Sequence, residues 1–210
     1  MLTYAQAKVT ILQQALPLEI ETAPFQRAIG RALAEPLVAI TDLPAFDNSA
    51  VDGYAVRHED LADATQDSPV ILPCTTYVYA GRTDVPKLAA ATCYQMSTGA
   101  PLATHADAIE MREHVRRDGE QIHFTHPTTL GNNVRRRAKD LHAGTELFPA
   151  GTTIAPTHLG LLAAQGLTEL PVRRLLRINI LSTGSELVEP DQTPSTGQIR
   201  ESNSYLLEGL

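Results

Sequence analysis

The residues with the clearest chemical potential lie in one short stretch, residues 46–54 (FDNSAVDGY). It carries two carboxylates, Asp47 and Asp52, with the amide of Asn48 and the hydroxyl of Ser49 between them. Such polar side chains hydrogen-bond their own backbone, so they favour a turn over a strand ladder. A polar loop between two aromatic residues is typical of a binding site. It is equally typical of a plain hairpin, so spacing alone leaves both interpretations open.

A second polar turn, residues 97–101 (STGAP), directly follows a strand-like segment. Its hydroxyl pair and glycine can present backbone amides and the Thr98 side chain to an anion. It lacks the lysine and the length of a nucleotide-binding P-loop. Taken alone, this turn is therefore a weak indication of a site.

The densest positive charge is at Arg135, Arg136 and Arg137, followed by Lys139 and Asp140. The chain as a whole has a net charge of −7. Arginine binds phosphate and other oxyanions in a bidentate manner. The cluster therefore indicates an oxyanion site, with a solvated basic strand as the alternative.

An apolar run at residues 175–182 is typical of the first, buried strand of a parallel sheet. It leads into a loop that contains Thr183, Gly184, Ser185 and Glu186. Open α/β sheets bind ligands at the carboxyl ends of such strands. The loop has no Gly-x-Gly-x-x-Gly pattern, so a dinucleotide is not indicated.

Composition limits the classes of function. The 210 residues, 43% of them hydrophobic and 20% charged, are typical of a soluble globular protein. The negative net charge argues against nucleic-acid and anionic-membrane partners. Two cysteines without a metal-binding spacing fit a reducing compartment. With no membrane-length apolar run and no signal-peptide pattern at the N-terminus, we expect a cytoplasmic protein.

The elements that must position these residues follow from local patterns. Thr3 is a suitable N-cap for a helix that ends before Pro17. Between residues 61 and 124 the apolar runs are short and separated by turn residues, which predicts a β-rich unit. Besides strands at 18–22, 37–40, 70–72, 77–80, 93–96, 108–111 and 121–124, we expect a solvated turn at 116–119 and helices at 27–34 and 158–165.

Four stretches together resemble one family. Residues 43–56 (LPAFDNSAVDGYAV) resemble the signature of the molybdopterin molybdenumtransferases, the family of MoeA and the gephyrin E domain. Residues 96–101, 131–137 and 181–187 match further family motifs in the same order. The resemblance runs over nearly the whole chain.

The resemblance implies the last step of molybdenum cofactor synthesis. Adenylylated molybdopterin would be cleaved with release of AMP, molybdate would be inserted as substrate, and Mg²⁺ would neutralise the phosphates. By motif match, the implied catalytic residues are Asp52, Thr98, Asp140 and Glu186, and Glu201 is the implied metal ligand. The implied substrate-binding residues are Asn48, Ser49, Gly99, Arg135, Arg136, Arg137, Ser182, Thr183 and Gly184.

The family's architecture implies an α+β multidomain fold. A β-rich domain at 45–138 is inserted into a small mixed α/β linker domain formed by 25–44 and 139–173. An N-terminal helix within 1–24 packs on a Rossmann-like, molybdopterin-binding α/β domain, of which 174–210 are only the start. Family members are homodimers, which implies that Asp52, Thr98 and Asp140 work with Glu186 and Glu201 of a second subunit. One strand cannot bury both faces of a sheet. We therefore expect that the chain is an N-terminal fragment of a longer enzyme and is inactive alone. The alternative is that another chain covers its last segment.

The sequence departs from the family pattern at several positions. The family usually has Met at 51, Gly at 105, Gly-Glu at 138–139, and Asp at 185 and 201, whereas this chain has Val51, His105, Ala138, Lys139, Ser185 and Glu201. Ala138 would strain the backbone if that position requires a positive φ. Two alternatives stay open: a catalytically impaired paralogue that still binds pterin or oxyanion, and a dimeric scaffold like gephyrin.

Overall fold

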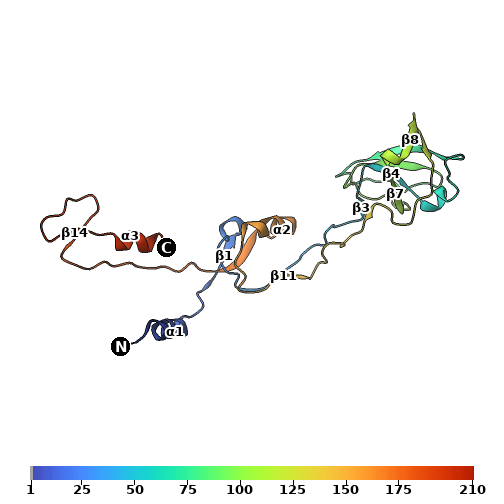
Figure 1. Cartoon of the computed structure of the whole chain (residues 1–210). Helices are drawn as coiled ribbons and strands as arrows, with labels where there is room; N and C mark the ends of the chain where they lie inside the picture. Colours follow the sequence, from blue (N-terminus) through green and yellow to red (C-terminus); the bar gives the residue numbers. More distant parts are fainter. Residues whose placement is uncertain (1) are drawn as a thin grey trace.

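The structure, a computed structural model, describes residues 2–210. Figure 1 shows an elongated chain with a β-rich unit at one end and a small mixed unit near the middle. Two extended segments, running in opposite directions along the chain, connect these units, and residues 4–14 and 203–208 both lie on the far side of the small unit. The β-rich unit is a mixed sheet within an α+β fold, as the sequence predicts.

Helix α1 (Tyr4–Gln14) begins where the sequence predicts. Thr3 is its N-cap: the Gln6 backbone amide donates to Oγ1 of Thr3, and the Thr3 amide donates to Oε1 of Gln6 at 2.9 Å. This capping box supplies acceptors for backbone donors that a helix N-terminus otherwise leaves unpaired. No residue of α1 is buried, so its packing on an α/β domain stays a prediction.

The small unit joins segments that precede and follow the β-rich unit in the sequence. Strand β1 (Ile20–Pro24) pairs antiparallel with β12 (Glu169–Arg173), and β2 (Leu37–Val38) pairs with β11 (Glu146–Phe148). The short helices η1 (Phe25–Arg27), η4 (Pro156–His158) and α2 (Leu159–Ala164) complete it. Its core consists of Ala23, Ala28, Leu33, Leu37, Ile154, Leu162, Leu170 and Val172.

The predicted helix at 27–34 is wrong. Only η1 is helical there, and Ala32 and Leu33 instead form bridges with Thr153 and Val172. Gly30 adopts a φ of +79°. This left-handed conformation interrupts a right-handed helix, so the chain turns and returns to the sheet.

The β-rich unit is built on one six-stranded sheet with the order β7-β4-β6-β5-β9-β8. Its strands are β4 (Gly53–Val56), β5 (Val70–Val78), β6 (Cys93–Met96), β7 (Ala108–Met111), β8 (Val115–Asp118) and β9 (Gln121–Phe124). Only β5 and β6 are parallel. The short helices η2 (His58–Leu61) and η3 (Arg112–His114) flank it, and two clusters of buried apolar side chains pack on it.

Two predicted turns in this region need correction. Arg116 and Arg117 belong to strand β8, and only residues 119–120 form the turn to β9. Asn48 and Ser49 form a short strand, β3 (Asn48–Ser49), paired with β10 (Val134–Arg135). Their side chains do bond the local backbone, with Nδ2 of Asn48 donating to the Phe46 carbonyl at 3.0 Å. The neighbouring arginine stretch nevertheless supplies a ladder partner that local sequence does not reveal.

Beyond Arg173 the chain is extended and carries little regular structure. Strands β13 (Leu187–Val188) and β14 (Ile199–Arg200) pair in parallel, and α3 (Asn203–Glu208) follows. The predicted buried strand at 175–182 is absent: no strand forms, and Leu181 is 86% exposed. A strand needs a neighbouring strand to pair its backbone, and no other described segment lies beside this one in a sheet. Within residues 2–210, no helix is both long and apolar enough to cross a membrane.

Candidate functional site

Strand β3 brings three of the sequence motifs together. Its Asn48 and Ser49 pair with Arg135 and Val134 of β10 on one side. On the other side the Ser49 carbonyl accepts a hydrogen bond from the Gly99 amide at 2.8 Å. The polar loop, the 97–101 turn and the arginine stretch therefore meet at one place, although the sequence separates them.

Asp52 and Thr98 are joined by two hydrogen bonds at this place. Oδ1 of Asp52 accepts hydrogen bonds from the Thr98 backbone amide at 2.8 Å and from its hydroxyl at 3.0 Å. The backbone amide and then the hydroxyl hold the pKa of the Asp52 carboxyl below its usual value. The carboxylate, which is ionised at neutral pH even at the ordinary pKa of aspartate, therefore stays ionised to a lower pH. Its side chain is 48% exposed, so it also faces solvent.

Arg112 adds a positive charge to this group. Its Nη1 lies 3.9 Å from Oδ2 of Asp52, and its backbone amide donates to the Asp52 carbonyl at 3.2 Å. Sequence reasoning missed Arg112, because no local motif contains it. Its place follows from the β4–β7 pairing, in which Gly53 lies opposite Met111.

A small polar cavity of about 80 Å³ lies beside these charges. It is lined by Asp52, Gly53, Tyr54, Tyr77, Gln95, Met96, Ser97 and Arg112. The Tyr77 hydroxyl and Oγ of Ser97 are hydrogen-bonded at 2.6 Å. Pockets for whole cofactor-sized ligands measure roughly 300–1,000 Å³, so this cavity can enclose only a small polar group of a ligand.

The arginine stretch is partly neutralised by nearby carboxylates. Nη1 of Arg136 donates to Oδ2 of Asp47 at 2.7 Å, and the Arg137 amide donates to Oδ1 at 2.7 Å. Burial raises the pKa of Asp47, but these hydrogen bonds outweigh it and the net pKa is lowered. The Arg137 side chain in addition pairs with Asp42. Two of the three predicted oxyanion-binding side chains therefore already have anionic partners.

Asp140 lies apart from this contact. Its backbone amide donates to the Leu43 carbonyl at 2.9 Å, and its side chain is exposed. Just before it, Ala138 adopts a φ of +58°, so the suspected left-handed conformation at this position is confirmed. His105 also has a positive φ, +76°. Both positions have the geometry that glycine tolerates best.

One buried atom near the site has no partner. Asn48 is only 5% exposed, and its Oδ1 accepts no hydrogen bond from the described residues. Buried polar atoms without a partner are uncommon and need an explanation. The loop that carries Asp52 therefore holds a buried acceptor that no described residue satisfies.

The remaining predicted residues form a second, separate group. Oε1 of Glu201 accepts hydrogen bonds from the Ser182 hydroxyl at 3.0 Å and the Ser204 amide at 2.9 Å. The hydroxyl and amide of Ser204 are the main causes of a lowered Glu201 pKa. An open cleft of about 290 Å³ is lined by Ser182, Gly184, Leu187, Val188, Glu189, Gln192 and Glu201. Thr183 and Glu186 are exposed on the same loop.

The two groups lie at opposite ends of the elongated molecule. Figure 1 shows β14, next to Glu201, far from β4 and β7. The structure thus brings Asp52 together with Thr98 and the loop of Asn48 and Ser49. It does not bring them to Glu186 or Glu201 of the same chain.

Comparisons with known proteins agree on one family. Residues 2–166 match the family model described as the MoeA N-terminal region, domains I and II. The chain is 43% identical over 186 residues to molybdopterin molybdenumtransferase 2 of Mycobacterium tuberculosis, covering 89% of this chain and 46% of that protein. It is 40% identical to the molybdopterin molybdenumtransferase of Synechococcus elongatus, over 100% of this chain and 53% of that protein.

A solved structure supports the same assignment. The molybdopterin biosynthesis MoeA protein of Pyrococcus horikoshii superposes with a TM-score of 0.90 at 32% identity, over 100% of this chain and 56% of that chain. The chain spans about half the length of the relatives that it matches.

Proposed function

The chain belongs to the family of the MoeA N-terminal region, and from this premise we propose that it provides half of the active site of a molybdopterin molybdenumtransferase. The substrate is adenylylated molybdopterin, from which AMP is released as molybdate is inserted. The observation that carries the proposal is the contact between Asp52 and Thr98, which joins two family motifs 46 residues apart.

The polar groups of the β-rich unit suit the anionic parts of such a substrate. Arg112, which also pairs with Glu113 at 3.0 Å, offers positive charge beside the small cavity, and the hydroxyl groups of Tyr77 and Ser97 line it. The ionised Asp52 lies among them and orients the Thr98 hydroxyl. The volume of about 80 Å³ suits a phosphate-sized group rather than the entire pterin nucleotide.

The C-terminal group suits a hard divalent cation. Glu201 and Ser182 offer only oxygen atoms, which are the donors that Mg²⁺ prefers. When bound, Mg²⁺ would neutralise phosphate charge. Glu201 would hold it, while Ser182, Thr183 and Gly184 of the neighbouring loop would bind the substrate, with Glu186 beside them.

We further propose that the site is completed by a second copy of the chain. The separation of the two groups in Figure 1 favours this arrangement, because neither group has the other within reach. A homodimer with two-fold symmetry would bring each group to the complementary group of its partner. Since both cysteines are free thiols, we place the reaction in the reducing cytoplasm. The net charge of −7 argues against a nucleic-acid or anionic-membrane partner.

A catalytically impaired paralogue is the second candidate. The pairing of Arg136 and Arg137 with Asp47 and Asp42 reduces the positive charge available to a substrate. The positive φ of Ala138 places a strained residue two positions before Asp140. Such a protein would bind pterin or oxyanion without turnover.

A rescue experiment separates the two candidates and tests the role of Asp52. Asp52→Ala, introduced into the intact protein, should abolish rescue of a host that lacks molybdenumtransferase activity. The wild-type protein and Asp84→Ala, which removes an exposed carboxylate paired with Arg82, should both rescue. Unchanged circular dichroism would show that the variant folds. Rescue by Asp52→Ala would contradict the proposed role, and failure of the wild-type protein itself would favour the impaired paralogue.

A further inference from the structure

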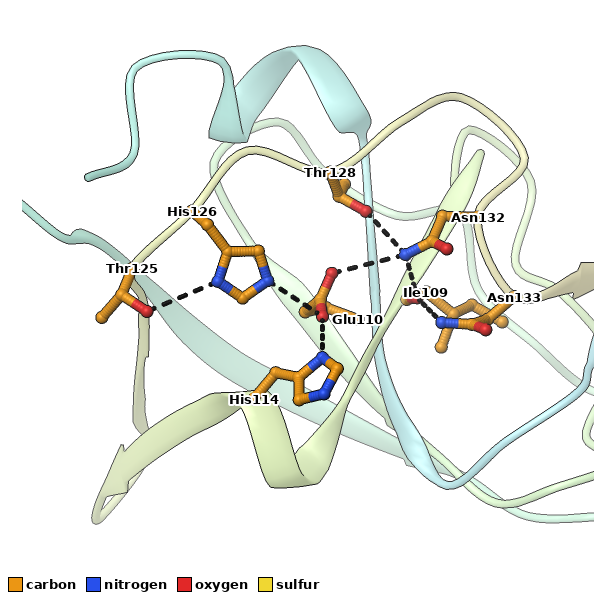
Figure 2. A network of polar contacts seen from close by, with 8 residues as sticks. All are labelled: Ile109, Glu110, His114, Thr125, His126, Thr128, Asn132 and Asn133. Carbon is orange, nitrogen blue, oxygen red and sulfur yellow. Dashed lines mark hydrogen bonds and ion pairs between the residues drawn. The ribbon is translucent and has the colours of Figure 1, made fainter. Parts of the chain in front are cut away.

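A second cluster of potential ligand atoms lies in the β-rich unit, outside the site described above. Glu110 on β7, His114 at the end of η3 and His126 after β9 converge, as Figure 2 shows. Oε1 of Glu110 lies 3.0 Å from Nδ1 of His114 and 3.2 Å from Nε2 of His126. One ligand atom from each residue lies within 4.8 Å of the other two.

These separations fit a bound transition-metal ion. Two ligand atoms at about 2.1 Å from a tetrahedral ion are roughly 3.4 Å apart, close to the observed distances. The hairpin of β8 and β9 makes the arrangement possible, because Val115 lies opposite Phe124 and the chain returns beside His114. No local sequence pattern indicates the site, since the ligands are spread over residues 110–126 and resemble no metal-binding motif.

The charge of Glu110 needs compensation. The residue is only 3% exposed, and a buried carboxylate is costly unless it is paired. Among residues 2–210, its ion-pair partners are the two histidines, and no lysine or arginine pairs with it. A divalent cation between the three side chains would supply the missing positive charge.

An outer layer of hydrogen bonds orients the cluster. Oγ1 of Thr125 lies 3.4 Å from Nδ1 of His126, on the ring edge that faces away from Glu110. Nδ2 of Asn132 donates to Oε2 of Glu110 at 3.4 Å and to Oγ1 of Thr128 at 2.9 Å. Metal-binding histidines and carboxylates characteristically have such partners, which fix the tautomer and the orientation. Oε2 of Glu110 and Nδ1 of His126, the atoms that do not face the other ligands, therefore each have a hydrogen-bond partner.

We propose that Glu110, His114 and His126 bind one divalent transition-metal ion, of which zinc fits best. Two imidazoles and one carboxylate are ligands that zinc accepts, with a fourth position left for water or another ligand. The side chains of His114 and His126 are 51% and 44% exposed, so the ion can enter from solvent and the fourth position is open.

The ion also lies close to the proposed active site. Helix η3 spans only Arg112–His114, so it carries a metal ligand at one end and the partner of Asp52 at the other. Binding of the ion fixes η3 and, with it, the position of Arg112. The site is nevertheless distinct, because none of its three ligands lines the cavity beside Asp52.

Zinc and cobalt titrations of the chelator-treated full chain test the proposal. We expect one zinc ion per chain by elemental analysis, and a visible Co²⁺ spectrum typical of four- or five-coordination. His114→Asn and His126→Asn should each reduce zinc affinity by more than about a hundredfold, because loss of an outer partner alone typically costs roughly 10- to 100-fold. Thr125→Val, which removes an outer partner, should reduce zinc affinity by only roughly 10- to 100-fold.

Matched variants keep the test interpretable. His105→Asn removes an exposed histidine at a positive φ, a conformation that asparagine tolerates, and should leave zinc affinity unchanged. Glu110→Gln keeps the shape of the side chain but removes its charge, so it should lose the ion while circular dichroism stays native. If the chain retains no zinc, or if both histidine variants bind it as tightly as the wild type, the cluster is only hydrogen-bonded and the proposal fails.

Discussion

Oδ1 of Asp52 accepts two hydrogen bonds from a single residue, one from the backbone amide of Thr98 and one from its hydroxyl. The two residues belong to different motifs, and the neighbouring β4–β6 pairing, with Gly53 opposite Met96, brings them together. The contact therefore depends on the sheet register. It also lowers the pKa of the carboxyl group.

Thr98→Val should raise the pKa of Asp52 toward its ordinary value. The variant removes the hydroxyl donor but keeps the backbone amide, so part of the lowering should remain. Carbon-13 NMR of the carboxyl group against pH measures the change, with Thr104→Val as an exposed control. An Asp52 titration identical to that of the wild type would contradict this account.

The lowered pKa of Asp52 also determines how the stability of the protein depends on pH. The pKa of Asp52 is lower in the folded than in the unfolded protein, so its contribution to stability is present above the unfolded value of about 3.9. It is lost as the pH falls through the folded value. Thr98→Val should therefore reduce the loss of stability in this acid range, measured by denaturant unfolding at several pH values.

Mixed dimers should reveal whether two subunits share a site. Asp52→Ala and Glu186→Gln are each expected to inactivate the intact protein. If each site combines Asp52 of one subunit with Glu186 of the other, a mixed dimer has one intact site, and random assembly should restore about a quarter of the activity.

The matched control for this experiment combines two defects in the same half-site. Co-expression of Asp52→Ala with Thr98→Ala leaves one defect in every site and should restore nothing. Equal activity from the two pairings, or no activity from the first, would show that the sites are not shared between subunits.

Gly53→Ala should destabilise the β-rich unit severely. A Cβ at this position would lie 2.2 Å from the carbonyl oxygen of Glu110, which belongs to the neighbouring strand β7. Relieving this overlap requires the two strands to separate, at a cost of about 3 kcal/mol or more in the free energy of unfolding.

Gly160→Ala is the matched control for this change. It adds the same methyl group in α2, where no atom lies within 4 Å, and should be neutral or stabilising by about 0.5–1 kcal/mol. Urea unfolding of both variants gives the comparison. Equal stabilities would contradict the close approach of β4 to β7.

Cys74 should react with alkylating agents well before Cys93. The pKa of Cys74 is lowered to about 6, mainly by hydrogen bonding with Cys93. The pKa of Cys93 is raised by the same hydrogen bond and by burial. Because the thiolate is the nucleophile, the rate of Cys74 alkylation should rise through about pH 6 and then level off. Mass spectrometry of iodoacetamide-treated protein locates the modified residue, and Cys74→Ser is the control. Faster modification of Cys93 would contradict the assignment.

Local patterns predicted those elements whose signals are local. The Thr3 cap of α1 and the strands at 93–96, 108–111 and 121–124 are confirmed. Each depends on a cap, an apolar run or a turn within a few residues. The helix at 27–34 and the strand at 175–182 were wrong, because a glycine conformation decided the first and the second has no neighbouring strand.

The sequence by itself determined the family, the order of its motifs and the chemical groups that they carry. Only the tertiary structure decided which of those groups meet. Asp52 meets Thr98 and Arg112, Arg136 meets Asp47, and Glu110 meets two histidines because particular strands pair in particular registers. Those registers depend on the burial of side chains from segments tens of residues apart. Such pairings leave no local periodicity in the sequence, so they become visible only in the folded chain.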